Sequence, residues 1–203
     1  MISTSEQEAF TSQGRSFLRW TRWLFVISGI LALAYAGLVL LNARQYQIAA
    51  SDTLNQQIQA ARQHIALPSA TAVREGDVLG KIEIPRLGFS AAVLQGTTAK
   101  TLLLGVGHIA GTALPGQPGN VGIAGHRDTF FRALKDVRQD DEINLQTVAG
   151  VVRYQVNWIQ ITAPSDVRIL SSTTGSTLTL VTCYPFHYIG PAPERYVVHA
   201  HRL

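Results

Sequence analysis

A thiol, an imidazole and a guanidinium stand where predicted strands begin or end. Cys183 closes the apolar and threonine-rich run 177–183, Arg195 opens the run 195–201, and His126 follows a third apolar run. A thiolate is a strong nucleophile, and a nearby cation lowers its pKa from about 8.5. An imidazole, with an ordinary pKa of about 6.5, can protonate a leaving amine and later deprotonate an incoming one. Because a guanidinium can hold a peptide carbonyl or a developing oxyanion, the three groups together would support covalent acyl transfer.

The spacing around Cys183 predicts two neighbouring strands with a loop at their end. Because side chains alternate along a strand, Cys183 shares a face with Val181, and Thr182 lies on the opposite face. The segment 184–194 holds three prolines, which cannot continue a central strand. If the two strands are antiparallel neighbours, Cys183 and Arg195 lie at the same end of the sheet and this loop overhangs them.

Each of these residues also has an ordinary structural interpretation. A lone cysteine in a strand is usually a small buried apolar side chain. A lone histidine is usually structural or solvated, and a lone arginine is usually a surface charge. Spacing alone therefore leaves both interpretations open for Cys183, His126 and Arg195.

The segment 76–203 has the pattern of a β domain. Strand-like runs separated by glycine and proline recur along it, and two helical stretches, 98–104 and 129–134, interrupt them. The predicted strands are 78–84, 91–94, 121–124, 142–145, 151–161, 178–183 and 196–201. About seven or eight short strands in this length predict an all-β fold, either a closed barrel or a sandwich.

The amino-terminal third predicts one membrane-spanning helix. Residues 24–41 are eighteen residues without a charge, which is the usual length of a spanning helix. Arginines and tryptophans precede this run, at Arg15, Arg19, Arg22, Trp20 and Trp23. Because cationic flanks stay cytoplasmic, we expect residues 1–23 to be a cytoplasmic tail and the later part of the chain to lie across the membrane. A cleaved signal peptide is the alternative, but its apolar region normally reaches only about 15 residues.

Residues 42–75 predict a helical stalk followed by a linker. Apolar side chains recur near helical spacing between Arg44 and Ile65, but the stripe is thin, which favours a spacer over a dimerising helix. Residues 66–73 contain a proline and small side chains typical of a linker. The predicted order is therefore tail, anchor, stalk and β domain.

Composition and charge exclude some classes of function. Of the 203 residues, 46% are hydrophobic and 15% are charged, so the chain has ample apolar area for a folded core. The net charge is +4, but residues 75–203 hold eleven Lys and Arg against ten Asp and Glu, a balance of +1. The β domain therefore lacks the basic footprint of a nucleic-acid-binding protein. A single cysteine excludes an internal disulfide framework and a multi-cysteine metal site.

Three motifs, in order along the chain, resemble those of sortases, the membrane-anchored cysteine transpeptidases. The run TLTLVTC at 177–183, with Arg195 twelve residues after Cys183, resembles the active-site strand pair of that family. GNVGIAGHR at 119–127 resembles its histidine segment, and GKIEIP at 80–85 resembles its early strand. The resemblance extends over about residues 76–203, the whole predicted β domain.

The resemblance implies a fold and residue roles. The fold would be a closed sortase-type β-barrel of about eight strands with short helices, preceded here by the transmembrane helix. Cys183 would be the nucleophile, His126 the general acid/base and Arg195 the group that holds the carbonyl or oxyanion. Thr182, through its hydroxyl or backbone N–H, and His187, on the loop after the nucleophile, are candidate binding residues.

The resemblance also implies a reaction, partners and a location. Sortases cut a carboxyl-terminal sorting signal of the LPXTG type after its threonine, form a thioacyl enzyme and transfer the acyl group to an amine. The partners would be secreted proteins with such a signal and an amine acceptor such as a cell-wall peptide or its precursor. The catalytic domain would lie outside the cell membrane, in an extracellular or periplasmic space. The motifs CYPF at 183–186 and HRDTFF at 126–131 look most like class D enzymes.

We expect no cofactor and no metal site. Four acidic side chains cluster at Asp136, Asp140, Asp141 and Glu142 and could bind Ca²⁺, as in some sortases. A calcium loop needs about six or more oxygens at ordered spacing, so a solvated turn is the better interpretation.

Two other functions fit the same residues. A cysteine endopeptidase would use water as the acceptor, and only product analysis separates it from a transpeptidase. A catalytically inactive surface adaptor would keep Cys183 buried and unreactive. The presence of all three candidate catalytic residues at predicted strand ends favours the enzyme.

Overall fold

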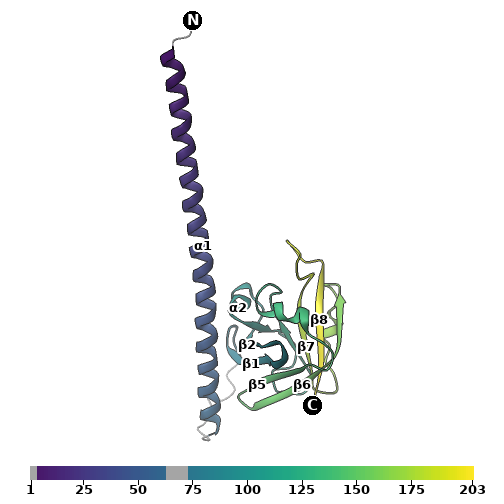
Figure 1. The fold of residues 1–203 in the computed structure, drawn as a ribbon. Coiled ribbons are helices and arrows are strands. Elements are labelled where there is room, and N and C mark those ends of the chain that lie inside the picture. Colours follow the sequence, from purple (N-terminus) through teal and green to yellow (C-terminus); the bar gives the residue numbers. More distant parts are fainter. Residues whose placement is uncertain (1–3, 63–72) are drawn as a thin grey trace. The chain divides into compact units, whose positions relative to one another are not determined.

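A long helix and a β-barrel make up the structure, a computed structural model that describes residues 4–62 and 73–203 (Figure 1). Helix α1 (Thr4–Arg62) runs without a break through the predicted anchor and the first part of the predicted stalk. It is long and apolar enough to cross a membrane: the candidate span lies within Trp20–Gln59, has a mean hydropathy of 2.5 and is not buried by protein. Apart from Val73, the predicted linker at 66–73 lies outside the described residues.

The chain divides into two compact units, Met1–Arg44 and Gln45–Leu203. Within the second unit, the last turns of α1 pack on the outside of the barrel. Ala50 is buried against Ala92. The amide oxygen and the amide nitrogen of the Gln47 side chain each bond to a backbone group of the β domain. Its Oε1 accepts a hydrogen bond from Ala92 N at 2.7 Å, and its Nε2 donates to Leu104 O. A spacer was predicted for this segment, and the thin apolar stripe of the sequence does not predict these contacts with the β domain.

Eight strands close into the barrel, in the order β1-β2-β3-β4-β7-β8-β6-β5. They are β1 (Val78–Ile84), β2 (Phe89–Gln95), β3 (Val106–His108), β4 (Asn120–Ala124), β5 (Glu142–Thr147), β6 (Gly150–Thr162), β7 (Thr177–Tyr184) and β8 (Glu194–Arg202). Neighbours β2/β3 and β4/β7 are parallel, and the remaining recorded pairs are antiparallel. The prediction of an all-β closed barrel with one preceding apolar helix is confirmed.

Short helices lie between the strands. They are η1 (Pro85–Leu87), α2 (Ala99–Leu104), η2 (Phe130–Asp136) and η3 (Val167–Leu170). The predicted helix at 98–104 is α2, whereas the one predicted at 129–134 is the 3-10 segment η2. Strand β3 was not predicted from the sequence, because three residues that include a glycine are too short to give an alternating pattern.

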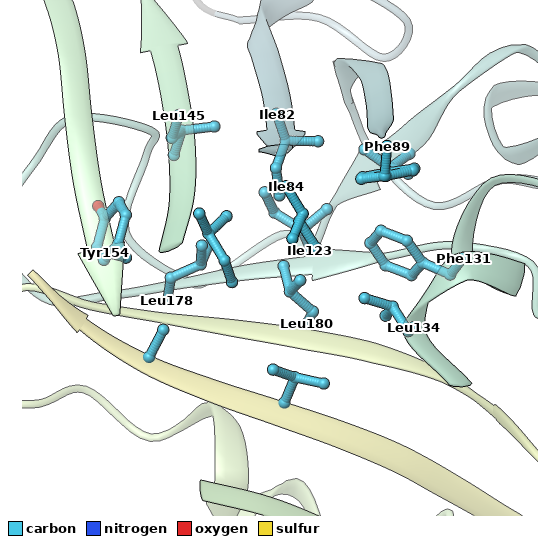
Figure 2. Close-up of a cluster of buried hydrophobic side chains, with 14 of the residues drawn as sticks. Ile82, Ile84, Phe89, Ile123, Phe131, Leu134, Leu145, Tyr154, Leu178 and Leu180 are labelled. Atoms are coloured by element: carbon cyan, nitrogen blue, oxygen red, sulfur yellow. The ribbon is translucent and has the colours of Figure 1, made fainter. Parts of the chain in front are cut away.

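The barrel interior is filled by alternate side chains of its strands, and Figure 2 shows this apolar core. Leu178 and Leu180 of β7 are fully buried there, as the alternation predicts for one face of that strand. Segment η2 adds Phe131 and Leu134 to the same core, and the Phe131 ring lies 5.9 Å from the ring of Phe89. Because burying such a side chain contributes about 1.5–3 kcal/mol, this core anchors both β7 and η2.

Candidate active site

The antiparallel pairing of β7 and β8 places Cys183 directly opposite Arg195. Leu180 of β7 and Val198 of β8 face the core, and alternation turns Cys183 and Arg195 to the outer face of the barrel wall. Both side chains are half-buried. The predicted geometry, with both residues at the same end of the sheet, is confirmed.

The parallel pairing of β4 and β7 brings His126 to this same end. Ala124 is in register with Val181, and Gly125 N donates a hydrogen bond to Val181 O at 3.2 Å. His126 lies two residues beyond Ala124, and Cys183 lies two residues beyond Val181. The half-buried histidine and the cysteine therefore stand at the ends of adjacent parallel strands.

Two hydrogen bonds and one close packing contact hold the backbone that carries His126. Phe131 N donates to His126 O at 2.9 Å, which turns the chain directly after the strand. A Cβ atom at Gly125 would lie 2.7 Å from the Phe131 ring, so this position accepts only glycine. The Thr182 hydroxyl donates to Gly125 O at 2.7 Å and joins the segment to β7. The fully buried Phe131 thus connects the core to the turn at His126.

The two candidate binding residues lie in different environments. Thr182 is buried on the face of β7 opposite Cys183, and its hydroxyl is already bonded to Gly125. Alternation turns this hydroxyl away from the thiol, so of the two groups that the prediction named, the backbone N–H of Thr182 stays the candidate for the oxyanion. His187 is exposed on the loop 185–193 between β7 and β8, as the sequence placed it.

Arg195 contacts the end of the β7–β8 loop. Its Nη1 donates to Glu194 O at 2.9 Å and to Ala192 O at 3.3 Å. These bonds hold the guanidinium beside the loop, on the face that carries Cys183. A second arginine, Arg127, reaches the same loop from the histidine segment, and no sequence pattern predicts this contact.

The connection between β6 and β7 covers the outer face at the beginning of β4 and β7. Asn120 Nδ2 donates to Ile169 O at 3.0 Å and to Ser171 O at 3.2 Å, while Thr179 Oγ1 donates to Asn120 Oδ1 at 2.8 Å. Asn120 and Thr179 are both buried. Buried polar groups need partners, so this network fixes η3 against β4 and β7. The sequence shows the two polar residues but not what they bind.

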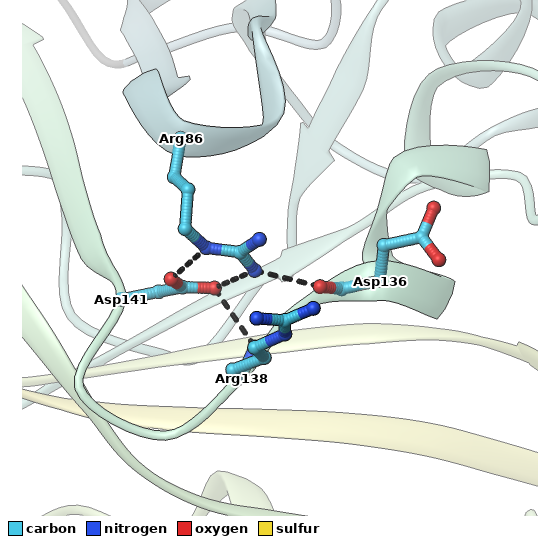
Figure 3. Close-up of polar contacts among 4 residues, drawn as sticks. All are labelled: Arg86, Asp136, Arg138 and Asp141. Atoms are coloured by element: carbon cyan, nitrogen blue, oxygen red, sulfur yellow. Dashed lines mark hydrogen bonds and ion pairs between the residues drawn. The ribbon is translucent and has the colours of Figure 1, made fainter.

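An arginine–carboxylate network holds the segment between η2 and β5 (Figure 3). The Arg86 guanidinium binds both oxygens of Asp141 through Nε and Nη2, with Nη2 2.6 Å from Oδ2. Its Nη2 also donates to Asp136 O at 2.6 Å, and Arg138 N donates to Asp141 Oδ2 at 2.8 Å. The bonds from Arg86 lower the pKa of Asp141 below its ordinary value. This bidentate pair braces the end of η2, the segment that supplies Phe131.

One member of the acidic cluster, Asp141, differs from the expected solvated turn, whereas Asp136, Asp140 and Glu142 are exposed. Asp141 is 7% exposed and pairs with the exposed Arg86, so its carboxylate is not part of a solvated turn. Its carboxylate is already bonded to Arg86. Within residues 20–59 and 73–203, no group of three or more His, Cys, Asp or Glu side chains is arranged to hold a metal ion.

Comparisons with known proteins agree with this geometry. The sortase domain family matches residues 82–203. Sortase D of Bacillus subtilis is 30% identical over 196 residues, which cover 89% of this chain and 96% of that protein. The structure of a Clostridium perfringens sortase D5 transpeptidase has a TM-score of 0.66 at 26% identity, and the match covers 78% of this chain and 99% of that one.

A second solved structure is Clostridium perfringens sortase C with the carboxyl-terminal cell wall sorting motif. Its TM-score is 0.60 at 28% identity, and the match covers 78% of this chain and 88% of that chain. The family match spans more than half of the chain, and the barrel and the relatives agree with it. The chain therefore belongs to the sortase family and is class D-like.

Proposed function

We propose that this sortase cleaves an LPXTG-like sorting signal after its threonine and transfers the acyl group to an amine. The observation that carries the proposal is the meeting of Cys183, Arg195 and His126 at the ends of β7, β8 and β4. The sorting motif in the related sortase C structure supports the substrate class. The chemistry needs no cofactor, because a thiol, an imidazole and a guanidinium supply each step.

The first half-reaction forms the thioacyl enzyme. The Cys183 thiolate attacks the carbonyl carbon of the threonine, a C–S bond forms and the carbonyl electrons move to oxygen. The Arg195 guanidinium donates hydrogen bonds to this oxyanion; its Nε and Nη2 meet no acceptor among residues 20–59 and 73–203. When the tetrahedral intermediate collapses, the C–N bond breaks and the imidazolium of His126 gives its proton to the leaving amine.

The second half-reaction reverses these roles. The neutral imidazole of His126 takes a proton from the incoming amine, whose nitrogen attacks the thioester carbon. A new amide forms, and Cys183 leaves as the thiolate. The acceptor would be the amine of a cell-wall peptide or its precursor, and the donors would be secreted proteins that carry the signal.

The proposed location is the cell membrane. Helix α1 would cross it once, with residues 1–23 in the cytoplasm and the barrel outside, because Arg15, Arg19 and Arg22 flank the apolar run on the amino-terminal side. Secreted substrates are accessible only in that orientation. Protease digestion of spheroplasts should therefore cleave the barrel, and a protected barrel would contradict the proposed topology.

The test uses the full-length chain in detergent, because part of α1 packs on the barrel. The protein is mixed with LPXTG-type peptides and a small amine, and intact masses are read beside the Cys183→Ala variant. We expect a thioacyl adduct that resolves to a new amide and is absent in the variant. Release of acid alone at high amine concentration would support an endopeptidase instead. No adduct, with Cys183 also inert to iodoacetamide, would support the inactive adaptor.

A further inference from the structure

The tip of the β7–β8 loop is held by Arg127, the residue directly after His126. Its Nη2 donates to Tyr188 O at 2.7 Å and to Gly190 O at 3.1 Å. Its guanidinium carbon also lies 5.9 Å from the centroid of the Tyr188 ring, within cation–π range. One side chain thus joins the histidine segment to the loop that connects Cys183 with Arg195.

The base and the tip of this loop are held in different ways. At the base, the Phe186 ring packs 5.1 Å from the ring of Tyr196 and touches the core. At the tip, the Ile189 side chain is 97% exposed and makes no such contact. Of the backbone bonds recorded within residues 185–193, the turn bond from Tyr188 N to Pro185 O, at 3.3 Å, stands alone. The charge-assisted bonds of Arg127 are therefore the main restraint on the tip.

The Arg127 side chain is poorly placed to stabilise the fold. Its Nη1 is buried and has no hydrogen-bond partner within residues 20–59 and 73–203, and a buried unpaired donor costs free energy. Each bond that its Nη2 makes goes to the β7–β8 loop rather than to the barrel. The contacts of this arginine favour a role in holding the loop.

We propose that Arg127 is a positioning residue that holds the β7–β8 loop against the histidine segment, so that the loop lies ready over the Cys183–Arg195 end of the barrel. The role in substrate binding rests on the function proposed above. Without the tether, the loop samples open arrangements and must be ordered each time substrate binds. The apparent affinity for substrate is then the intrinsic affinity multiplied by the fraction of molecules whose loop is closed.

The test compares Arg127→Gln with Arg127→Lys and with the matched control Arg132→Gln in the full-length protein. Arg132 is exposed on η2 and makes no recorded side-chain bond in the described chain, so this control removes the same charge from a nearby segment. We measure hydrogen exchange of amides in 185–193, the thermal midpoint of unfolding, and kcat and KM for an LPXTG-type peptide.

For Arg127→Gln we expect loop amides to exchange about tenfold faster, because two charge-assisted hydrogen bonds are lost. KM should rise by about the same factor, with a smaller change in kcat and an unchanged thermal midpoint. Arg127→Lys should restore part of both effects, because the ammonium keeps the charge and can donate to at least one carbonyl.

Two results would overturn the proposal. The first is loop exchange in Arg127→Gln equal to that in Arg132→Gln. The second is faster loop exchange with kcat and KM both unchanged. If the wild-type protein forms no acyl adduct with any peptide, the proposed function fails, but hydrogen exchange still decides whether Arg127 tethers the loop.

Discussion

The two faces of the β7–β8 strand pair have different roles. On the inner face, Leu178, Leu180 and Val198 are fully buried and give the barrel its stability. On the outer face, Cys183 and Arg195 are half-buried at the end of the same two strands, where the proposed substrate would bind. A rigid apolar face can therefore position polar groups on its reverse side without contacting them.

The largest effect on the inner face should come from Leu180→Ala. The substitution leaves a cavity in the core and should lower the free energy of unfolding by about 2–5 kcal/mol. Pulse proteolysis in urea, on the full-length protein in detergent, measures this loss. The matched control Val181→Ala lies one residue along on the outer face and should cost less. Equal losses for the two variants would contradict the division of the faces.

The corresponding outer-face variant is Arg195→Ala. We expect kcat/KM to fall by about 10²–10³-fold, because a donor to the developing oxyanion is lost. The free energy of unfolding should change by no more than about 0.5 kcal/mol, as for other partly exposed positions. Arg202→Ala removes an exposed arginine from the same strand and serves as the control in peptide assays. A large loss of stability in Arg195→Ala would show that this arginine supports the fold instead.

The smallest effect concerns His199, farther along the outer face of β8. Its ring stacks on Trp158 with centroids 4.6 Å apart, and its Nδ1 lies 2.8 Å from Asn157 Oδ1. Burial, with a smaller contribution from His201, lowers the pKa of His199. The unfolded chain therefore binds more protons in mild acid, and stability decreases as the pH falls below about 6.5.

The variant His199→Phe keeps an aromatic ring against Trp158 but cannot bind a proton. The free energy of unfolding should therefore fall less steeply between about pH 6.5 and pH 5 than in the wild type. Some dependence should persist, because burial also lowers the pKa of His108. Pulse proteolysis at a series of pH values measures both slopes, and identical slopes would contradict burial of a neutral His199.

Because side chains alternate along a strand, the sequence predicts much of the difference between the two faces of β7. The period of two placed Leu180 and Cys183 on opposite faces of β7, and the prolines placed a loop between Cys183 and Arg195. The parallel pairing of β4 with β7 did not follow from any local pattern, because the strands are far apart in the chain. His126 was therefore placed beside Cys183 by resemblance alone.

The contacts that hold the site in place could not be predicted from local sequence patterns either. The glycine at position 125 is explained by the Phe131 ring packed against it. The role of Arg127 is explained by its bonds to the carbonyls of a loop about sixty residues away. The hydroxyl of Thr182 bonds to Gly125, a residue that becomes its neighbour only through the pairing of β4 with β7. Such contacts depend on which strands become neighbours, and a single sequence does not encode that order locally.

Mapping the acyl group onto the chain identifies the nucleophile directly. The full-length protein is mixed with an LPXTG-type peptide, quenched in acid, digested and mapped by tandem mass spectrometry. We expect an acyl mass on the fragment that contains Cys183, removable by hydroxylamine and much reduced in Arg195→Ala. Peptide cleavage without acylation of Cys183, or an acyl group on another residue, would show that Cys183 is not the nucleophile.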